Sequence, residues 1–589
     1  MGKASIGLRA AALAAAAAMV LAACGGSSDD GDGGSGGDSG DSGKPTKGGT
    51  LTFLTLAEQI QHLDPQRNYT GDDLAFASAY LNRTLTSYKM STDDKTANEL
   101  TPDLATDTGT PNEDSTSWQF TVRDGVKWED GSPVTCEDVK YGVSRTFATD
   151  LIVDGPQYAV AYLDVPKDKD GASVYKGPYV TKGNDTAAFD KAVTCDGSTI
   201  TFNLANPVPD FNFTVTLSAF APVPKAADTG EKYDQKPVSS GPYKISEYTI
   251  GNQLVLVRNE NWDPETDDYR GAYPDKVVVK FGQDPTVIDQ RIIRDSGDDA
   301  RTTTFGDSIQ ASNLAAVFND PRMADRRTDE FDAYVYYYAV NVSKLPNVKH
   351  RQAIAAALDR GQIRTISGGK YAGTLADGVI KPNLPADYAE SGMWSGLLGG
   401  DIPDAGSPEL AKQLIEESGE PMPEVRFDYS QTPERDKEAA AVVTSLKKAG
   451  INVRPNPIEP GQYYSIVLDP EKAGELMWSG WGPDWPNAST VVPELFTPAG
   501  GFNLSQVDDA DFSAKVQGAK ENTDRASQSE QWKELNKEAM EQVWAIPTLF
   551  GRTQTMAGSK VRAASGKNGN VYVWAPYSSW SYTDLYVLP

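Results

Sequence analysis

Few residues of this chain have the chemistry for catalysis or metal binding. The 589 residues include two histidines, His62 and His350, and three cysteines, which is too little material for a zinc or copper centre. No H-E-x-x-H motif occurs. Gly33–Gly37 matches the nucleophile-elbow pattern G-x-S-x-G, but it lies in a run of Gly, Ser and Asp that forms neither the strand nor the helix that the elbow needs. The 82 acidic residues single out no carboxylate pair for glycoside hydrolysis. We therefore predict no catalytic residue, no metal and no cofactor.

Charge and composition exclude further classes of protein. Acidic residues outnumber Lys and Arg by 82 to 55, which gives a formal net charge of −27. A nucleic-acid-binding protein needs a basic surface to replace the counterions of the phosphates, so we exclude nucleic acid as a partner. With 39% hydrophobic and 23% charged residues, the composition is that of a globular protein. A collagen, a coiled coil and a wholly disordered chain are excluded.

The N-terminus predicts export and a lipid anchor. A short basic segment precedes an apolar run at Ala10–Leu21, which is too short to span a bilayer comfortably. The residues Leu21-Ala-Ala-Cys24 resemble a bacterial lipobox, which implies a signal peptide over 1–23 and lipid attached to Cys24. An ordinary signal peptide, cut at an A-x-A-like site, is the alternative. The acyl chains would hold the protein on the outer face of the cell membrane without a spanning helix.

The segment after Cys24 predicts a flexible tether. Residues 25–43 contain only Gly, Ser and Asp, so they bury no apolar surface and their like charges repel one another. We assign the lipidated cysteine and the tether to residues 24–47.

The two remaining cysteines, Cys136 and Cys195, lie in a part of the chain that is predicted to be exported. Thiols in an exported protein meet an oxidising environment, in which disulfides form and persist. A bond between them would close a loop of about 60 residues and stabilise the fold by about 4 kcal/mol in the chain-entropy treatment. We expect the disulfide; the alternative is two free, buried thiols.

Strand patterns alternate with helix patterns along the folded part of the chain. Ser407-Pro408 and Thr432-Pro433 each combine an N-cap residue with proline at the first helical position. Gly419 and Gly450 are predicted to end these two helices. The run Ile451–Arg454 follows the second helix directly, and strand, helix and strand with short connections form a βαβ unit, which predicts a parallel sheet covered by helices. Further strands are predicted at Leu51–Leu56, Lys276–Phe281, Tyr334–Val340 and Val425–Tyr429.

Several short segments, spread in order over five hundred residues, match one known family together. They are Gly48–Phe53, Leu63–Pro65, Pro102–Ala105, Trp118–Arg123, Gly125–Val134, Glu137–Val139, Pro222–Ala227, Gly241–Tyr243, Arg351–Ile354 with Asp359-Arg360, and Leu446–Ile451. With these motifs the chain resembles the solute-binding proteins of bacterial ABC importers, in the family that includes oligopeptide- and dipeptide-binding proteins. The resemblance extends over essentially all of 48–589.

The resemblance implies a fold and a division into parts. The fold is α/β, two-lobed and periplasmic-binding-protein-like, with a hinged cleft and an extra subdomain inserted in the first lobe. Lobe one is expected at 48–325, with the insertion at about 86–237, and lobe two at 326–547. Residues 548–589 are expected to return to lobe one. The stretch around 150–190 is longer than is usual in the family, and the sequence assigns it no role.

The segment Trp478–Asn487 contains the predicted ligand site. It resembles the family segment in which a tryptophan precedes an aspartate by three residues, and in peptide-binding members that aspartate binds the α-amino group of the peptide. The resemblance therefore assigns Asp484 to the ligand's ammonium group. A closed cleft excludes water, so a cation enclosed in it needs a fixed carboxylate. The alternative is that the tryptophans are core or surface aromatics and Asp484 is a turn residue.

The residues around Asp484 complete the predicted site. Tryptophan suits such a site because it offers a large apolar area with one hydrogen-bond donor. Two residues after the first strand are added because family members place cleft-lining residues there. We predict ligand contact for Trp481, Gly482, Pro483, Asp484, Trp485, Glu58 and Gln59.

The function implied by the resemblance is solute capture for transport. We expect an extracytoplasmic lipoprotein that binds peptides in the cleft between its lobes and delivers them, as a monomer, to the permease subunits of an ABC transporter. One alternative is a binding protein of the same fold for a non-peptide solute such as a sugar, an opine or a metal chelate. The other alternative is a secreted hydrolase, but no catalytic motif in the sequence supports it.

Overall fold

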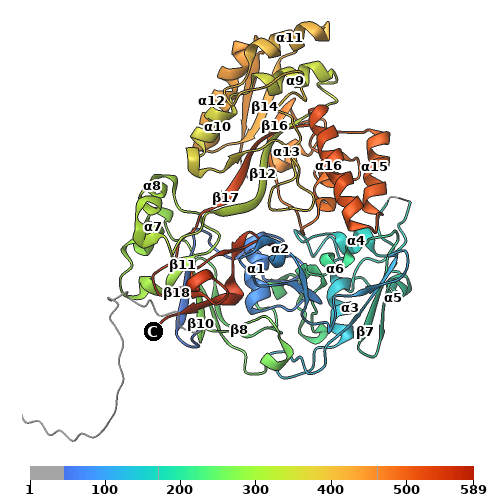
Figure 1. The fold of residues 1–589 in the computed structure, drawn as a ribbon. Helices are drawn as coiled ribbons and strands as arrows, with labels where there is room; N and C mark the ends of the chain where they lie inside the picture. The colour runs from blue at the N-terminus through green and yellow to red at the C-terminus, as the bar shows by residue number, and fades with distance from the viewer. Residues whose placement is uncertain (1–44, 170, 460–461) are drawn as a thin grey trace, which may run out of the picture. The chain divides into compact units, whose positions relative to one another are not determined.

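The computed structural model describes residues 45–169, 171–459 and 462–589. The predicted signal peptide (1–23), the lipidation site Cys24 and nearly all of the predicted tether (24–47) lie outside these residues. Within them, the chain is organised around two large β-sheets (Figure 1), and each sheet has a hydrophobic core of its own. The two-lobed α/β fold class that the sequence predicted is confirmed.

The first large sheet contains β1, from the beginning of the described chain, and residues near the C-terminus pack against it. Its five strands lie in the order β11-β1-β10-β9-β8, with β1 parallel to β10 and β11 and the others antiparallel. Leu51 and Phe53 of β1 point into the core, where Phe53 packs against Phe76 of helix α1 and Tyr582 near the C-terminus. The elements are β1 (Thr50–Leu54), α1 (Gly71–Tyr80), β8 (Tyr243–Thr249), β9 (Gln253–Arg258), β10 (Lys276–Lys280) and β11 (Thr302–Thr304).

A smaller antiparallel sheet has the strand order β4-β5-β7-β6. In the sequence, its strands come after α1 and before β8. It has a separate hydrophobic core around Trp118, Phe120 and Phe202. A disulfide links Cys136, the first residue of α3, to Cys195 in β6, which is the pairing expected from the sequence. The elements are β4 (Thr110–Pro111), β5 (Ser117–Thr121), α3 (Cys136–Arg145), α4 (Tyr158–Tyr162), α5 (Thr186–Ala192), β6 (Val193–Asp196), β7 (Thr199–Asn203) and α6 (Phe211–Thr214).

The second large sheet has six strands in the order β13-β17-β12-β16-β14-β15. The predicted βαβ unit is present, because β14 and β15 are parallel and α12 connects them. β14 is also parallel to β16, but the prediction of a parallel sheet was wrong for the remaining strands: β12 is antiparallel to both β16 and β17, and β13 is antiparallel to β17. β12 is the strand by which the chain enters this sheet, and β17 is the strand by which it leaves. The two strands lie side by side, and because the chain runs in along one and out along the other, they are antiparallel. The strands are β12 (Glu330–Val340), β13 (Thr374–Leu375), β14 (Val425–Ser430), β15 (Val453–Ile458), β16 (Leu476–Trp481) and β17 (Ala545–Thr553).

The helices that cover the second sheet begin where their caps predict. The side chain of Ser407 accepts a hydrogen bond from the backbone of Leu410, and that of Thr432 accepts one from Arg435. Gly419 ends its helix with a φ of 70°, in the left-handed region that glycine adopts without strain. These helices are α9 (Val348–Ala357), α10 (Arg360–Ile366), α11 (Pro408–Ser418), α12 (Pro433–Lys448), α13 (Tyr463–Val467), α14 (Val492–Phe496), α15 (Ala510–Lys520) and α16 (Arg525–Glu541).

The remaining elements are short or peripheral. They are β2 (Thr86–Tyr88), α2 (Asp94–Ala97), β3 (Leu100–Pro102), α7 (Pro285–Arg294), α8 (Ala311–Asn319), β18 (Val561–Ala563), β19 (Val573–Trp574), β20 (Ser579–Trp580) and β21 (Leu585–Val587). Of the helices in the described ranges, none is both long enough and apolar enough to span a bilayer.

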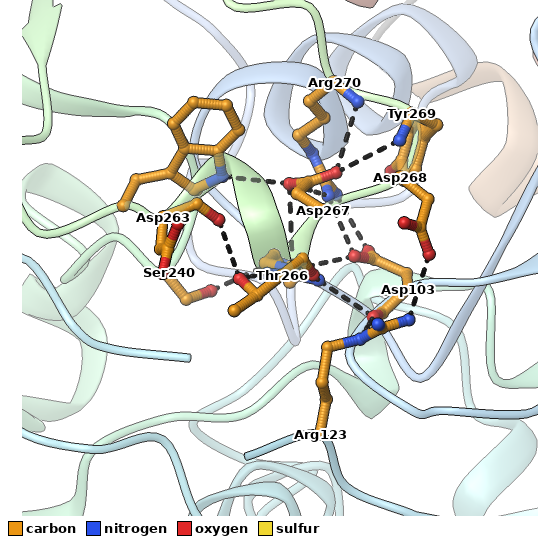
Figure 2. Close-up of polar contacts among 12 residues, drawn as sticks. Asp103, Arg123, Ser240, Asp263, Thr266, Asp267, Asp268, Tyr269 and Arg270 are labelled. Carbon is orange, nitrogen blue, oxygen red and sulfur yellow. Dashed lines mark hydrogen bonds and ion pairs between the residues drawn. The ribbon is translucent and has the colours of Figure 1, made fainter. Parts of the chain in front are cut away.

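A buried network of charges ties the connections of the first sheet together (Figure 2). The guanidinium of Arg270 donates to both carboxylate oxygens of Asp103, at 2.9 Å each, and to Asp267 at 3.0 Å. Arg83 donates to Asp103 at 2.8 Å. All four side chains have no solvent exposure, and two positive charges face two negative ones. Each charge is compensated inside the network, so we assign it to the stability of the fold and not to ligand binding.

Candidate functional site

The loop after β16 carries most of the residues that the sequence assigned to the site. β16 pairs with β12, and its last residue, Trp481, lies opposite Val335. A Cβ atom on Gly482 would lie 3.0 Å from the carbonyl oxygen of Ala333, so glycine lets the loop pass close to β12. The loop then continues to Asp484, which is partly exposed.

The carboxylate of Asp484 is surrounded by tyrosine hydroxyls. The Tyr158 hydroxyl donates a hydrogen bond to Oδ2, and the Tyr69 hydroxyl interacts with the same carboxylate. The backbone N–H of Asp484 donates to Oγ1 of Thr490 at 3.1 Å, which fixes the loop. Burial raises the pKa of Asp484 to about 6, although the two hydroxyls act in the opposite direction. Among the described residues, Asp484 has no ion pair with a cationic side chain, so its charge is available to a ligand.

The two tryptophans of the loop have different surroundings. Trp481 is partly exposed; its Nε1 donates to the carbonyl oxygen of Thr490 at 2.8 Å, and its ring lies 4.9 Å from that of Phe502. Trp485 is only 1% exposed, and its Nε1 donates to Asp210 at 2.8 Å. Trp481 is therefore accessible in part, and its predicted ligand contact stays a prediction. Trp485 holds the loop from inside the protein, and its predicted ligand contact stays a prediction.

The two candidates after β1 lie apart from this loop. The carboxylate of Glu58 is directed toward Gly251 and Gly282, where a Cβ atom would lie 3.1 Å and 3.3 Å from its oxygens. Gln59 lines a pocket of about 410 Å³ that also contains Asp72. The structure does not bring Glu58 to Asp484, and it places Gln59 in a separate hollow.

A row of stacked rings, which the sequence did not single out, lies on β12 and β16. Tyr334 and Tyr336 are two residues apart, so they share a face of β12. The ring centroids of Tyr334 and Tyr336 are 6.2 Å apart, and those of Tyr336 and Trp478 are 6.0 Å apart, with both pairs stacked. Burial and the nearby carboxylates of Asp332, Asp72 and Asp484 raise the pKa of Tyr334 to about 12. The alternation of tyrosines in the strand was the signal for this aromatic row.

A hollow of about 470 Å³ lies next to the aromatic row. Tyr336, Trp478 and Arg435 line it, together with residues of α8, α10 and β17. A slightly larger hollow of about 520 Å³ lies between residues 46–52 and the C-terminal residues 587–589. That second hollow contains none of the predicted site residues.

No cluster of three or more His, Cys, Asp and Glu side chains in the described ranges is arranged to hold a metal ion. The arrangement of the site is suited to non-covalent binding: an unpaired carboxylate at one end, a surface of aromatic rings and an adjoining pocket.

Comparison with known proteins gives consistent matches. The profile described as "Bacterial extracellular solute-binding proteins, family 5 Middle" matches residues 99–503. The oligopeptide-binding protein OppA of Bacillus subtilis is 24% identical over 457 residues, which cover 74% of this chain and 77% of that protein. The heme-binding protein A of Haemophilus influenzae is also 24% identical, over 535 residues, or 87% of this chain and 88% of that protein.

The solved structures agree with the fold. The structure titled "Clavulanic acid biosynthesis oligopeptide binding protein 2" is 27% identical, covers 93% of this chain and 97% of its own, and superimposes with a TM-score of 0.81. The named relatives bind solutes of different chemistry, so the fold alone does not fix the ligand.

Proposed function

Because the chain belongs to the bacterial extracellular solute-binding proteins of family 5, we propose that it captures peptides outside the cytoplasm and delivers them to the permease subunits of an ABC transporter. The observation that carries this proposal is the Asp484 carboxylate, which has no cationic partner among the described residues. A peptide ammonium group supplies that partner. Relatives named for oligopeptide binding support the same class of ligand.

We propose that the ammonium group binds Asp484 as a charge-assisted hydrogen bond, in place of water that lobe closure excludes. Gly482, Pro483 and Trp481 shape the wall beside it. β14 pairs with β16 only at Leu476 and Met477, so within the described chain the end of β16 has no strand partner on that side. The carbonyl oxygen of Trp478 accepts a hydrogen bond from the Tyr463 hydroxyl. The backbone beyond it, toward Trp481, would pair with an extended peptide, as in strand addition.

The remaining parts of the proposal follow from the predicted leader and from the two cores. We propose a lipid on Cys24, a tether over 24–47 and a monomeric binding protein without catalytic activity. The separate cores of the two large sheets support two lobes, with boundaries near those expected at 48–325 and 326–547. β17 stays in the second sheet as far as Thr553, so we propose that the return to lobe one, expected over 548–589, begins after this strand. Closure of two such lobes on a ligand requires contacts that only the closed form makes.

One experiment tests the proposed ligand class. The protein is purified from its native host without denaturation, and the small molecules that it releases on unfolding are identified by mass spectrometry. The proposal expects peptides with free amino termini, and their affinity is then measured by calorimetry with the refolded, ligand-free protein. Recovery of a heme or a sugar instead, with no binding of peptides, would overturn the peptide assignment and leave the family membership intact.

A further inference from the structure

Lys381 is a buried cation beside the candidate site. It lies in the irregular segment between β13 and α11, and its side chain is only 2% exposed. Its Nζ atom lies 2.7 Å from Oδ1 of Asp332, 2.8 Å from the carbonyl oxygen of Asp332 and 2.6 Å from that of Tyr334. A fourth oxygen, the carbonyl of Gly551, lies 3.3 Å away. The three N–H donors of the ammonium group therefore meet four acceptors, all of them on β12 and β17.

These acceptors surround a bulge in the pairing of the two strands. Between Phe331 and Val335, the three residues 332–334 of β12 lie opposite the single residue Gly551 of β17. β16 pairs with β12 only from Val335 onward. Residues 332–334 therefore have no ladder partner on either side, and their backbone groups need other partners. Lys381 supplies a donor for the first and the last of the three carbonyl groups.

The carboxylate of Asp332 holds the same bulge from within. Its Oδ1 accepts the ammonium group of Lys381 and also the backbone N–H of Tyr334, at 2.7 Å each. The N–H and the carbonyl group of Tyr334 are thus both held, one by Asp332 and the other by Lys381. Gly551 leaves room for this arrangement, because a Cβ atom there would overlap Oδ2 of Asp332. The backbone of Tyr334 is therefore fixed at two points.

The ring of Tyr334 lies between parts of both lobes. Its neighbour Ala333 contacts the loop after β16, where a Cβ atom on Gly482 would lie 3.0 Å from the Ala333 carbonyl oxygen. Burial, together with carboxylates that include Asp72 of α1 and Asp484, raises the pKa of Tyr334 to about 12. The side chain is nevertheless 45% exposed. Part of the ring surface is thus left for a ligand to cover.

A lysine is not the side chain that stability alone would favour at this position. Burial lowers the pKa of Lys381, and the carboxylate of Asp332 acts in the opposite direction. An apolar side chain would fill the same space without the cost of burying a charge, but it would leave carbonyl groups of the bulge without donors. The contribution of Lys381 is therefore to specify one conformation of the bulge.

We propose that Tyr334 is a ligand contact near Asp484, and that Lys381 is the positioning residue that holds the ring there. This inference rests on the proposed function, because it takes the ammonium group of a peptide at Asp484. The ring then covers the first residues of the peptide, with its face against a side chain or a peptide bond. Lys381 itself does not touch the ligand, since its donors are directed to β12 and β17.

The test is a double-mutant cycle on the affinity for Ala₄, a peptide with a free amino terminus and no charged side chain. Tyr334→Ala removes the ring, and Lys381→Met removes the ammonium group but keeps a long side chain. By calorimetry we expect each variant to bind roughly tenfold or more weakly, as for loss of an aromatic contact at a binding site. The double variant should lose no more than the larger of the two, because Lys381 acts through Tyr334. Additive losses would overturn the positioning role.

Two further variants separate positioning from stability. Lys381→Arg keeps a positive charge with N–H donors and should retain part of the affinity. Asp103→Asn is the matched control, because it breaks a buried charge pair away from the bulge and lowers stability too. At a temperature at which both proteins are folded, Asp103→Asn should bind Ala₄ with unchanged affinity. A loss equal to that of Lys381→Met would show that reduced stability explains the effect, and would overturn the positioning role.

The outcomes distinguish this inference from the proposed function. Full affinity of Tyr334→Ala for Ala₄ would overturn the inference and leave the ammonium site at Asp484 standing. Failure of Ala₂ through Ala₆ to bind the unmodified protein would overturn the proposed function and this inference with it. If Lys381→Met fails to fold, Lys381→Arg replaces it in the cycle, and its loss should disappear in the Tyr334→Ala background. A loss that persists there would again overturn the positioning role.

Discussion

The Tyr158 hydroxyl donates a hydrogen bond to Oδ2 of Asp484, although 326 positions of sequence separate the two residues. Tyr158 begins α4, which packs beside the small inserted sheet, whereas Asp484 follows β16 of the second large sheet. Trp485 strengthens this connection, since its ring lies 4.9 Å from that of Tyr158. The loop that carries Asp484, the residue proposed to bind the ammonium group, is therefore held both by the second large sheet and by the part of the chain that contains α4. Changes on either side should alter ligand affinity.

The first prediction concerns the charge of Asp484. Asp484→Asn keeps the size of the side chain and removes the carboxylate, so a peptide ammonium group would lose its partner. Loss of one partner of a buried charge pair costs about 2–5 kcal/mol, which is roughly a 30-fold or greater loss of affinity. N-acetylation of the peptide should cost as much against the unmodified protein and little more against the variant. Calorimetry of all four combinations measures the coupling; additive losses would show that the amine and the carboxylate do not meet.

The second prediction is a pH dependence of affinity. Burial holds the pKa of Asp484 at about 6 in the ligand-free protein, and pairing with an ammonium group requires the ionised form. Below pH 6 binding must expel a proton, so affinity should fall by about tenfold per pH unit. It should also fall above about pH 8, where the α-amino group of the peptide deprotonates.

Two variants test which titrating group causes the loss of affinity at low pH. Asp484→Asn should bind weakly and lose the dependence between pH 5 and 7. His62 also has a raised pKa, because Asp234 accepts a hydrogen bond from it, and its charged contacts are with Asp154 and Asp234. His62→Gln should therefore keep the acid limb, and its disappearance in that variant would move the titrating group away from Asp484.

The local elements could be predicted from the sequence because their signals are local. The cap residues Ser407 and Thr432 begin their helices as expected, since a side-chain oxygen next to proline satisfies backbone donors in any context. The strand at Tyr334–Val340 was likewise visible in its residue types. The mixed direction of the second sheet was not, because strand pairing depends on where the chain returns.

The candidate site was predicted only in part, for a related reason. Asp484 was identified from its spacing to Trp481 and a family resemblance. No signal in the sequence identified Arg435. The stacking of Arg435 on Trp478 joins residues 43 positions apart, and the contact of Tyr158 with Asp484 joins two parts of the chain that have separate hydrophobic cores. Such contacts depend on tertiary packing, so no short pattern encodes them. Tyr158 gives a role to part of the long segment near 150–190.

The third prediction concerns the disulfide between Cys136 and Cys195. Replacing both cysteines with serine removes a cross-link over 59 positions, which should lower the free energy of unfolding by about 4 kcal/mol. Ligand affinity should stay within a few fold, because neither residue lies in the loop after β16 or in the aromatic row. Chemical unfolding of the double variant measures the loss, and peptide mapping without reductant checks the bond. Recovery of both as free thiols from the native protein would contradict the prediction.

The fourth prediction concerns the buried charge network around Asp103. Asp103→Asn leaves Arg83 and Arg270 with one compensating carboxylate between them, so the free energy of unfolding should fall by about 3–5 kcal/mol. The matched control is Asp268→Asn, which breaks the exposed pair with Arg123 and should cost less than about 1 kcal/mol. Denaturant unfolding of both variants measures the difference. Equal, small losses would show that the network contributes little to stability.

The fifth prediction concerns Asp210, whose hydrogen bonds hold the loop that carries Asp484 in its docked position. Its Oδ2 accepts hydrogen bonds from Nε1 of Trp485 at 2.8 Å and from Oγ of Ser489 at 2.7 Å. Asp210→Ala leaves the buried indole donor unsatisfied, and an unmade buried hydrogen bond costs about 1–3 kcal/mol. Because this cost falls on the form in which the loop is docked, the equilibrium should shift toward an open form and affinity should drop by roughly 5- to 150-fold.

Asp210→Asn retains an acceptor oxygen, so it should recover most of the affinity that Asp210→Ala loses. Small-angle scattering of the ligand-free proteins provides a second readout. The alanine variant should have the larger radius of gyration, and saturating peptide should bring it to the value of the unmodified protein. Reduced affinity without expansion would mean that Asp210 shapes the loop locally and does not control closure.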